Sequence, residues 1–341
     1  MQAVILAGGS GTRLRPLTSR VAKPVVTLVD RPFIVYMLDW LRRHGCTDVI
    51  LCCGFGAQGV AAVLGDGSDY GVALRYVAES EPLGTGGPLL LARELLDERF
   101  VVCNGDILTD IDLGAQISEH EHTGAAATLA LVSVEDASAY GMVRLAPDDA
   151  VLEFVEKPSE PGSGGALISA GAYVLQRSVL ELIAPGRQVS IEREVWPALI
   201  GAGLYGHRAN GYWLDIGTPE RYLQGSFDII TGAVRVDDRP ARDSGAIGAR
   251  CEIADDATIG ELVVLGEDVR VGSGASIERS VVLSGAQIGA GSVLRDSIVA
   301  ERAKIGRNVE LRDGVVVGED AQIAAGHRVE AGARVAAGER V

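Results

Sequence analysis

The sequence predicts an α/β fold in two domains, a mostly parallel sheet with helices in residues 1–235 and a parallel β-helix in residues 236–341. The length of 341 residues suits two domains of common size. Strand-like and helix-like stretches alternate in the first part of the chain, and aliphatic residues recur every six positions in the second. The change between these two patterns near residue 235 sets the predicted domain boundary.

Short, continuous apolar runs in the first part indicate buried strands at 2–7, 48–53, 73–78 and 100–103. Helical spacing of apolar residues predicts helices at 33–44, 86–98 and 112–122. This alternation is typical of a Rossmann-like, mostly parallel sheet that is covered on both faces. Later runs at 126–132, 143–145, 151–155 and 168–175 predict antiparallel or mixed strands, and 218–231 predicts a closing helix.

The six-residue period after about residue 240 predicts a left-handed parallel β-helix. The expected inward-facing residues are Ile247, Ile253, Ile259, Leu265, Val271, Ile277 and Leu283, then, after a change of register through Ile288, Leu294 and Val299, Ile305, Leu311, Val317, Ile323, Val329, Val335 and Val341. A period of six fits neither an α-helix nor a coiled coil. With one such residue on each side and three sides to a coil, the stretch gives about five coils.

Composition excludes several classes of protein. Lysine and arginine number 31 against 46 acidic residues, a net charge of −15, so we expect no nucleic-acid partner. No run approaches the roughly 20 apolar residues of a membrane span, and the first apolar run is too short for a signal peptide. Five cysteines without metal-type spacing read as small apolar residues in a reducing compartment. We therefore expect a cytoplasmic protein without a membrane partner.

A glycine-rich loop after the first strand predicts a phosphate site. Gly8, Gly9 and Gly11 allow backbone N–H groups to approach and point at an anion. The loop lacks the lysine of a P-loop and the third glycine of a dinucleotide fingerprint. The first 29 residues contain no carboxylate but do contain basic residues, namely Arg13, Arg15, Arg20 and Lys23. This local positive charge in an acidic chain favours phosphate binding.

Lysine is rare in the chain, which draws attention to where it occurs. There are three lysines among the 31 basic residues, and two of them, Lys23 and Lys157, precede a proline. Because the composition otherwise favours arginine, a lysine at these turns suggests a need for a compact ammonium group.

These motifs resemble those of the sugar-1-phosphate nucleotidylyltransferase (NDP-sugar pyrophosphorylase) family. The opening signature of that family is matched from Leu6 to Thr18 and then at Lys23-Pro24. Further matches follow in order at Glu79–Gly87, Asn104-Gly105-Asp106, Tyr140-Gly141, Glu156-Lys157-Pro158, Ser169-Ala170-Gly171 and Trp213–Pro219. Together with the hexapeptide repeats, they make the chain most similar to mannose-1-phosphate or heptose-1-phosphate guanylyltransferases, over nearly its whole length.

The resemblance implies an enzyme that joins an NTP to a sugar 1-phosphate and releases pyrophosphate, with Mg²⁺ as cofactor. It assigns catalytic roles to Arg13, Lys23 and Lys157, and magnesium ligation to Asp106 and Asp215. The implied nucleotide-binding residues are Leu6, Ala7, Gly8, Gly9, Gly11, Thr12, Glu79, Pro82, Gly84 and Thr85. The implied sugar-phosphate contacts are Tyr140, Gly141, Glu156, Lys157, Ser169, Ala170, Gly171 and Trp213. The nucleophile is itself an anionic phosphate oxygen, so the residues need only position the substrates and stabilise charge.

Two positions bear on the choice of substrates. Where the family often has glutamine, this chain has Glu79, an acceptor-only carboxylate that suits the N–H donors of guanine and favours GTP. Glu81 is an equal candidate for that role at this level. Ser169 stands where the family usually has asparagine, so the sugar could be of mannose or heptose type.

Other functions remain as alternatives at the level of sequence. They are a thymidylyl- or uridylyltransferase that acts on glucose 1-phosphate, a catalytically silent subunit that binds an NDP-sugar, and an acyltransferase that uses the β-helix. The lone His327 disfavours the acyltransferase, and His120 and His122 read as solvated polar residues. The β-helix is expected to mediate association into a homo-oligomer.

Overall fold

The structure, a computed structural model, describes residues 1–54, 56–158, 165–239 and 245–341. The chain forms two compact units. The first unit comprises Met1–Gly9 and Met37–Trp213, and the second comprises Ser10–Tyr36 and Leu214–Val341. The glycine-rich loop therefore spans both units, since it starts in the first and continues into the second.

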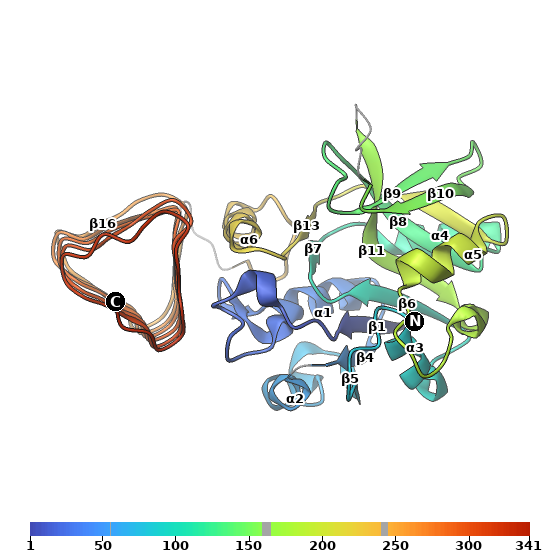
Figure 1. The fold of residues 1–341 in the computed structure, drawn as a ribbon, viewed down its shortest axis with the longest axis horizontal. Coiled ribbons are helices and arrows are strands. Elements are labelled where there is room, and N and C mark those ends of the chain that lie inside the picture. The colour runs from blue at the N-terminus through green and yellow to red at the C-terminus, as the bar shows by residue number, and fades with distance from the viewer. Residues whose placement is uncertain (55, 159–164, 240–244) are drawn as a thin grey trace. The chain divides into compact units, whose positions relative to one another are not determined.

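The first unit contains a nine-stranded mixed sheet, whose main path has the order β10-β9-β11-β6-β1-β4-β5 (Figure 1). Its strands are β1 (Gln2–Ala7), β4 (Asp48–Cys53), β5 (Ala73–Ala78), β6 (Arg99–Asn104), β8 (Ala127–Val134), β9 (Gly141–Leu145), β10 (Val151–Glu156), β11 (Ala166–Gln176) and β12 (Leu204–Arg208). β1 pairs in parallel with β4 and β6, and β11 pairs antiparallel with β6, β8 and β9. The predicted sheet, parallel with later antiparallel strands, is confirmed.

The described residues contain helices at the predicted ranges 33–44, 112–122 and 218–231, together with others. They are α1 (Phe33–Arg43), α2 (Ala57–Leu64), α3 (Gly87–Leu91), α4 (Leu113–Thr123), α5 (Trp196–Leu199) and α6 (Pro219–Thr231). The single helix expected over 86–98 was wrong, because α3 ends at Leu91 and a separate 3₁₀ turn covers Arg93–Leu95. α2 and α5 were not predicted. No helix in the described ranges has the length and apolar composition needed to cross a bilayer.

The core of the first unit packs aromatic residues between the sheet and its helices. Trp196 is fully buried, as expected, and its ring lies 5.0 Å from that of Tyr173. His120 is also fully buried, so the prediction of a solvated residue was wrong. Its Nδ1 lies 2.9 Å from the Thr128 hydroxyl, and its Nε2 lies 3.1 Å from the Gln176 amide. Two strands thus supply polar partners that local sequence does not reveal.

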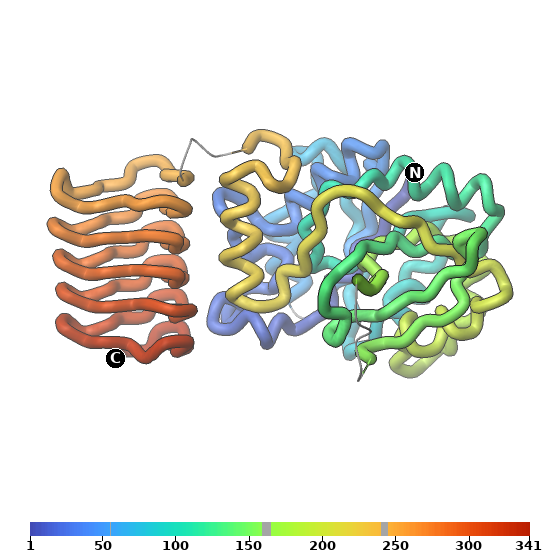
Figure 2. Tube along the Cα trace, turned by 90° about the horizontal axis from the view of Figure 1, so that it is seen from above, coloured from blue at the N-terminus to red at the C-terminus, as the bar shows by residue number. Residues whose placement is uncertain are grey.

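The second unit contains the predicted β-helix, with a three-sided cross-section (Figure 1) and stacked coils (Figure 2). One side is the sheet β14 (Gly245–Ile247), β17 (Val263–Leu265), β20 (Val281–Val282), β23 (Ile298–Val299), β26 (Val316–Val317) and β28 (Arg334–Val335). The second side is β15 (Glu252–Ile253), β18 (Arg270–Val271), β21 (Gln287–Ile288), β24 (Lys304–Ile305) and β27 (Gln322–Ile323). The third side is β16 (Thr258–Ile259), β19 (Ser276–Glu278), β22 (Val293–Arg295) and β25 (Glu310–Leu311).

The inward ladder follows the predicted register with one error. Leu265 pairs with Val282, and Val282 pairs with Val299, so Val282 occupies the position that was assigned to Leu283. The side between Ile277 and Val282 is therefore one residue shorter than the six-residue repeat. Ile247 is in register with Leu265 but is 57% exposed, because β14 is the first strand of its sheet.

One side of the β-helix is buried on both faces. Val264, Val281, Ile298 and Val316 have no exposed surface although they alternate with the inward-facing ladder. The same unit contains α6, which contacts β14, and the hairpin of β2 (Thr27–Leu28) and β3 (Arg31–Pro32). A sheet that is covered on both faces needs continuous apolar strands, which this side has.

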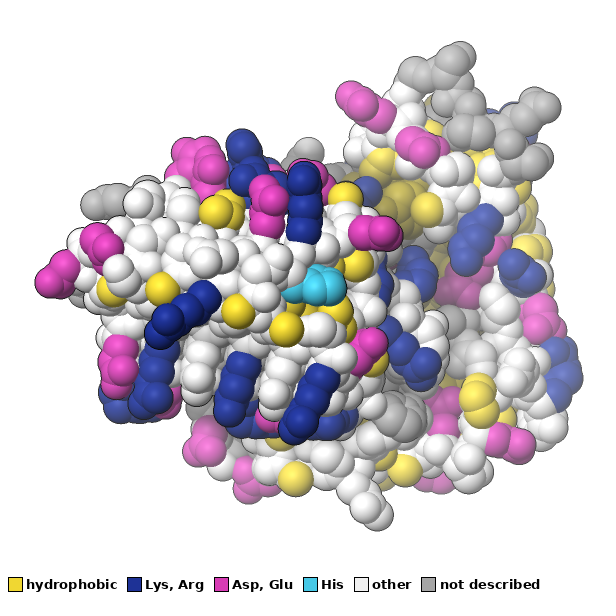
Figure 3. Space-filling view, turned by 60° about the vertical axis from the view of Figure 1, so that its left-hand side comes forward, with side chains coloured by type: hydrophobic (Ala, Val, Ile, Leu, Met, Phe, Trp, Pro, Cys, Tyr) yellow, Lys and Arg dark blue, Asp and Glu magenta, His cyan; other side chains and the backbone are white. Residues whose placement is uncertain are grey.

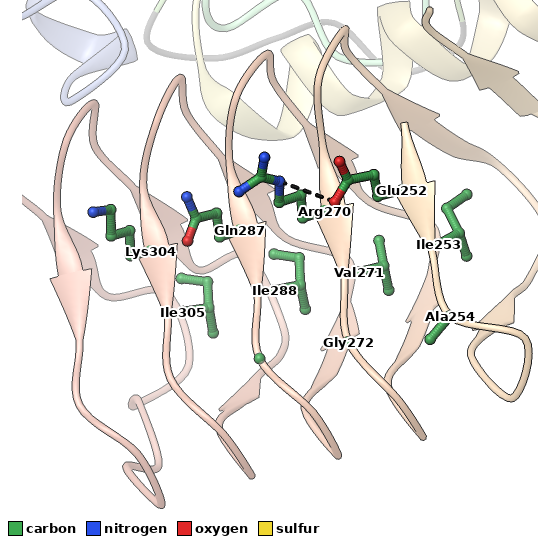
Figure 4. A pocket seen from close by; sticks show the side chains of 11 residues that line it. Glu252, Ile253, Ala254, Arg270, Val271, Gly272, Gln287, Ile288, Lys304 and Ile305 are labelled. Atoms are coloured by element: carbon green, nitrogen blue, oxygen red, sulfur yellow. Dashed lines mark ion pairs between the residues drawn. The ribbon is translucent and has the colours of Figure 1, made fainter. Parts of the chain in front are cut away.

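Ion pairs join successive coils on the outer surface of the β-helix. Examples are Arg250 with Asp268 at 2.7 Å, Arg270 with Glu252 at 3.2 Å and Arg279 with Asp296 at 2.8 Å. Lysine and arginine side chains lie in rows across the coils (Figure 3). A shallow groove crosses β15, β18, β21 and β24 beside one such row (Figure 4). Exposed pairs of this kind contribute little each to stability.

Candidate active site

The carboxyl ends of β1 and β6 lie side by side in the first unit. Leu6 is in register with Asn104, and the Gly105 amide donates to the Leu6 carbonyl at 2.9 Å. A Cβ at Gly105 would lie 2.7 Å from that oxygen, so the close approach requires glycine. The half-buried Asp106 follows directly. This edge of an open α/β sheet is where ligands bind, and it brings Asp106 close to the start of the glycine-rich loop.

Glu79 lies against the glycine-rich loop. A Cβ at Gly8 would lie 2.3 Å from Oε1 of Glu79, so the carboxylate occupies the space beside this glycine. Its Oε2 accepts a hydrogen bond from the Leu83 amide at 3.1 Å. Burial raises the pKa of the Glu79 carboxyl, and the Leu83 N–H opposes that rise. Glu81, the other sequence candidate, is exposed.

The rest of the loop Glu79–Gly87, here called the base-side loop, packs on the segment that precedes α5. Val189 donates from its amide to the Leu83 carbonyl at 3.0 Å, and it accepts from the Gly86 amide at 2.9 Å. A Cβ at Gly84 would lie 2.3 Å from the Val189 carbonyl oxygen, and Gly84 has a φ of 77°. Gly84 is thus required by a close approach between two backbones. Pro82 of the same loop is exposed.

The predicted sugar-side residues come from β9, β10, β11 and β13 (Trp213–Asp215) and from the residues next to β9 and β10. The Trp213 indole N–H donates to the Ala170 carbonyl at 2.7 Å, and its ring lies 5.3 Å from that of Tyr140. The Lys157 amide donates to the Tyr140 carbonyl at 2.9 Å. Gly171 has a φ of 70°, and a Cβ there would lie 2.7 Å from Nδ2 of Asn104. The sugar-side group therefore adjoins the end of β6.

Two further polar residues belong to this group. Glu156 is in register with Gly141, where a Cβ would lie 3.0 Å from Oε2 of Glu156. Burial raises the pKa of the Glu156 carboxyl, and the charge of Glu192 raises it further. The Ser169 hydroxyl donates to the Tyr173 hydroxyl at 3.4 Å. The Ser169 side chain thus points toward the buried Tyr173.

The second unit contains the remaining part of the signature. Gly11 has a φ of 62°, and its carbonyl accepts a hydrogen bond of 2.7 Å from the hydroxyl of the buried Thr18. A Cβ at Gly11 would lie 3.2 Å from Cβ of Lys23, so the loop packs tightly on the Lys-Pro turn. A 3₁₀ turn over Thr12–Leu14 then presents Arg13 as an exposed side chain.

Arg13 and Asp215 lie beside the same glycine in the second unit. A Cβ at Gly217 would lie 3.1 Å from Nη2 of Arg13 and 3.0 Å from Oδ2 of Asp215. The absence of a side chain at Gly217 thus leaves room for a guanidinium and a carboxylate next to each other. Within the described residues, no three histidine, cysteine, aspartate or glutamate side chains cluster as a ready-made metal site.

Sequence reasoning did not single out residues 189–192, although they contact the base-side loop. The available signal was Ser190 followed by acidic residues, a pattern that marks the start of a helix. The Ser190 hydroxyl does accept from the Arg193 amide at 3.3 Å at such a start.

Comparison with known proteins agrees with this arrangement. The nucleotidyl transferase family matches residues 2–232, and the GMPPB C-terminal domain matches residues 242–336. Mannose-1-phosphate guanylyltransferase of Mycobacterium tuberculosis is 37% identical over 84% of this chain and 81% of its own length. Mannose-1-phosphate guanylyltransferase 1 of Arabidopsis thaliana is 36% identical over 83% of this chain and 80% of its own length.

A solved structure is also similar to about two thirds of this chain. The crystal structure of HddC from Yersinia pseudotuberculosis complexed with GMP-PN is 28% identical, with a TM-score of 0.56. The match covers 66% of this chain and 97% of that one. Members of this family of enzymes generally use a divalent metal ion. On the matches to both parts of the sequence, the chain belongs to the nucleotidyl transferase family and carries a C-terminal domain of the GMPPB type.

Proposed function

We propose that this protein transfers a guanylyl group from GTP to mannose 1-phosphate, giving GDP-mannose and pyrophosphate. A phosphate oxygen of the sugar phosphate forms a bond to the α-phosphorus of GTP, and the bond between that phosphorus and the bridging oxygen to the β-phosphorus breaks. The names of both relatives described above support this pair of substrates. Family membership supports the reaction type independently of the sugar.

The position of Glu79 is the observation that carries the proposal. Its carboxylate lies against Gly8, at the start of the loop that we assign to the triphosphate. A carboxylate accepts hydrogen bonds but donates none, so it matches the N1–H and N2–H₂ donors of guanine. The same group would repel the carbonyl oxygens of uracil or thymine. GTP is therefore favoured over UTP and dTTP.

Cationic residues supply the electrostatic part of the mechanism. We assign the β- and γ-phosphates and the departing pyrophosphate to Arg13, whose planar fork suits two phosphate oxygens. Lys23 is assigned to the α-phosphate, and Lys157 to the phosphate of the sugar. No general base is needed, because the attacking oxygen is already an anion. Bringing two anions together and stabilising the transition state is the work of these three residues.

Two aspartates would hold the divalent cation of the family. Asp106 follows β6 at the ligand-binding edge of the sheet, and Asp215 lies over Gly217 beside Arg13. Hard carboxylate oxygens suit Mg²⁺, which keeps waters and phosphate oxygens as its other ligands. The charge of the bound ion supplies stabilisation of the phosphate oxygens during transfer. Both residues are proposed as ligands on this basis.

Tyr140, Trp213 and Glu156 are proposed to contact the sugar. The two rings lie edge to face at 5.3 Å and present an apolar surface next to polar groups, as carbohydrate sites require. Ser169 hydrogen-bonds Tyr173, which leaves the backbone of Ala170 and Gly171 as the further contacts with the sugar phosphate.

The two parts of the chain have different roles in this proposal. Residues 1–235 perform the transfer, and the β-helix of residues 236–341 mediates association between copies. We further propose that the protein works in the cytoplasm.

The experiment is a matrix of GTP, ATP, CTP, UTP and dTTP against mannose, glucose and heptose 1-phosphates, scored by release of pyrophosphate. We expect the highest kcat/KM for GTP with mannose 1-phosphate. Glu79→Gln should reduce the preference for GTP over UTP and dTTP. A matrix in which dTTP with glucose 1-phosphate is the best pair would overturn the proposal.

Asp106→Asn tests the metal assignment in the same assay. We expect kcat to fall by about 10²-fold or more, because a transition-state contact to charge is lost. Asp69→Asn, which changes an exposed aspartate of the same unit, is the matched control and should retain activity. Equal activity of the two variants would refute the role of Asp106.

A further inference from the structure

The hydroxyl of Thr85 makes hydrogen bonds within the protein itself. It donates to Oε2 of Glu192 at 2.7 Å, and it accepts from the Ile191 amide at 2.8 Å. A hydroxyl has a single hydrogen to donate, so this side chain has no donor left for a nucleotide. Thr85 thus joins the base-side loop to the helical segment that starts after Ser190, more than a hundred positions along the chain.

Glu192 is the centre of this junction. Its Oε2 accepts from both the Thr85 hydroxyl and the Ser190 hydroxyl, the latter at 2.8 Å. The carboxylate is half-buried, and hydrogen bonds to a charged acceptor are about twice as strong as neutral ones. Glu192 therefore fixes Thr85 from a side chain, whereas Val189 fixes the neighbouring Leu83 and Gly86 from the backbone.

The loop transmits this restraint to Glu79. Leu83 lies two residues before Thr85, and its amide donates to Oε2 of Glu79 at 3.1 Å. The carboxylate of Glu79 in turn lies against Gly8. The hydrogen-bonded connection runs from Glu192 to Thr85, along the loop to Leu83, and from there to the carboxylate proposed to read the base.

We infer that Glu192 is a positioning residue for the nucleotide base: through Thr85 it holds the Glu79–Gly87 loop in the conformation that presents Glu79 to guanine. This inference rests on the proposed guanylyl transfer, and it adds a residue that touches neither substrate. The charge of Glu192 also raises the pKa of Glu156 on the sugar side, and the charges of Lys157 and Arg193 oppose that rise. The hydrogen bonds of Glu192 go to Thr85 and Ser190, so it holds the loop of only one of the two proposed substrate sites.

The test measures two properties of single variants. In Glu192→Ala and Thr85→Val, KM for GTP should rise about tenfold, with KM for mannose 1-phosphate within about twofold of the wild type. Amide hydrogen exchange in residues 79–87 should become faster in both variants. Glu192→Gln and Thr85→Ser retain the acceptor and the hydroxyl respectively, so both should restore the wild-type KM for GTP and the wild-type exchange.

Two controls make the result specific. Glu194→Ala removes an exposed carboxylate of the same segment, which pairs with Arg187, and should leave both KM values unchanged. The double variant Glu192→Ala/Thr85→Val should be no worse than either single variant, because both remove the same interaction. Unchanged exchange and unchanged KM for GTP in Glu192→Ala would overturn the inference, as would an equal rise in both KM values. An inactive wild type would contradict the proposed function instead, and the exchange measurement would still decide whether Glu192 holds the loop.

Discussion

Arg20 donates a hydrogen bond of 2.6 Å to Asp320, a residue 300 positions further along the chain. The pair joins the segment that bears the signature cations to the fifth coil of the β-helix, within one compact unit. Asp320 also accepts from Arg302, and both Arg20 and Arg302 lie near Glu319. The signature segment and the β-helix therefore meet through a charged surface cluster.

Arg20→Ala should reduce the free energy of unfolding by no more than about 1 kcal/mol. The two side chains are 47% and 39% exposed, and pairs at such positions are screened by water and salt. Urea unfolding at low and at high salt measures the effect, which should shrink at high salt. A loss above about 2 kcal/mol at both salt concentrations would show that the pair is more than a surface contact.

Ile277→Asp should destabilise the β-helix far more than Ile259→Asp. The two isoleucines are in register on adjacent strands, but Ile277 is fully buried whereas Ile259 lies on the first strand of its sheet and is half-buried. Burying an unpaired carboxylate in place of packed methyl groups costs about 3 kcal/mol or more. The midpoints of thermal unfolding followed by circular dichroism measure both variants. Equal midpoints would contradict the register of the coils.

His120 should make stability depend on pH. Burial, with a smaller effect of Arg99, lowers the pKa of His120 to about 4, below its usual value in an unfolded chain. The contribution of neutral His120 to the free energy of unfolding is therefore complete above pH 6.5. It is lost as the pH falls toward 4, because His120 of the unfolded chain binds a proton at a higher pH than His120 of the folded chain. Between pH 7.5 and 5 the loss is about 2 kcal/mol.

His120→Gln provides the comparison for that measurement. The amide can replace the ring in hydrogen bonds to Thr128 and Gln176, and it does not titrate. The unfolding free energy of the wild type relative to this variant should fall by that amount over the same range of pH. A difference that stays constant with pH would mean that folding does not change the pKa of His120.

Cysteine labelling should distinguish one thiol from the other four. Cys46, Cys52, Cys53 and Cys103 are at most 1% exposed, and burial raises the pKa of each thiol. Cys251 is partly exposed on the first coil of the β-helix. The native protein should therefore react with a thiol reagent at one site, and Cys251→Ser should not react. Rapid reaction of two or more thiols in the wild type would contradict the packing of the sheet.

The sequence predicts the strands of the sheet well because their side chains are buried by the elements next to them. The runs at 2–7 and 48–53 coincide with β1 and β4, in which nearly every side chain is buried. The inward-facing positions of the β-helix are equally predictable, because each coil needs an aliphatic residue at the same positions. Leu283 was wrongly predicted to face inward, because it is an aliphatic residue whose burial has another cause. It is buried on the outward face of its sheet, a burial that the period of six does not encode.

The parts of the site that the sequence could not predict depend on contacts between distant segments. Motifs marked Glu79 and Gly8 separately, but their packing against each other is visible only in three dimensions. Thr85 and Glu192 belong to different stretches, and no local pattern joins a threonine in one loop to a glutamate 107 residues away. Buried His120 was missed for the same reason, because its partners lie on β8 and β11.

The grouping of Ser10–Tyr36 with Leu214–Val341 has a consequence for biosynthesis. Residues 10–36 bear the signature cations, but the residues grouped with them, 214–341, are translated much later. The strands β1 to β12 lie within residues 1–213, so the sheet can be completed earlier. The segment that bears Arg13 and Lys23 therefore reaches its final environment only after residues 214–341 have emerged from the ribosome.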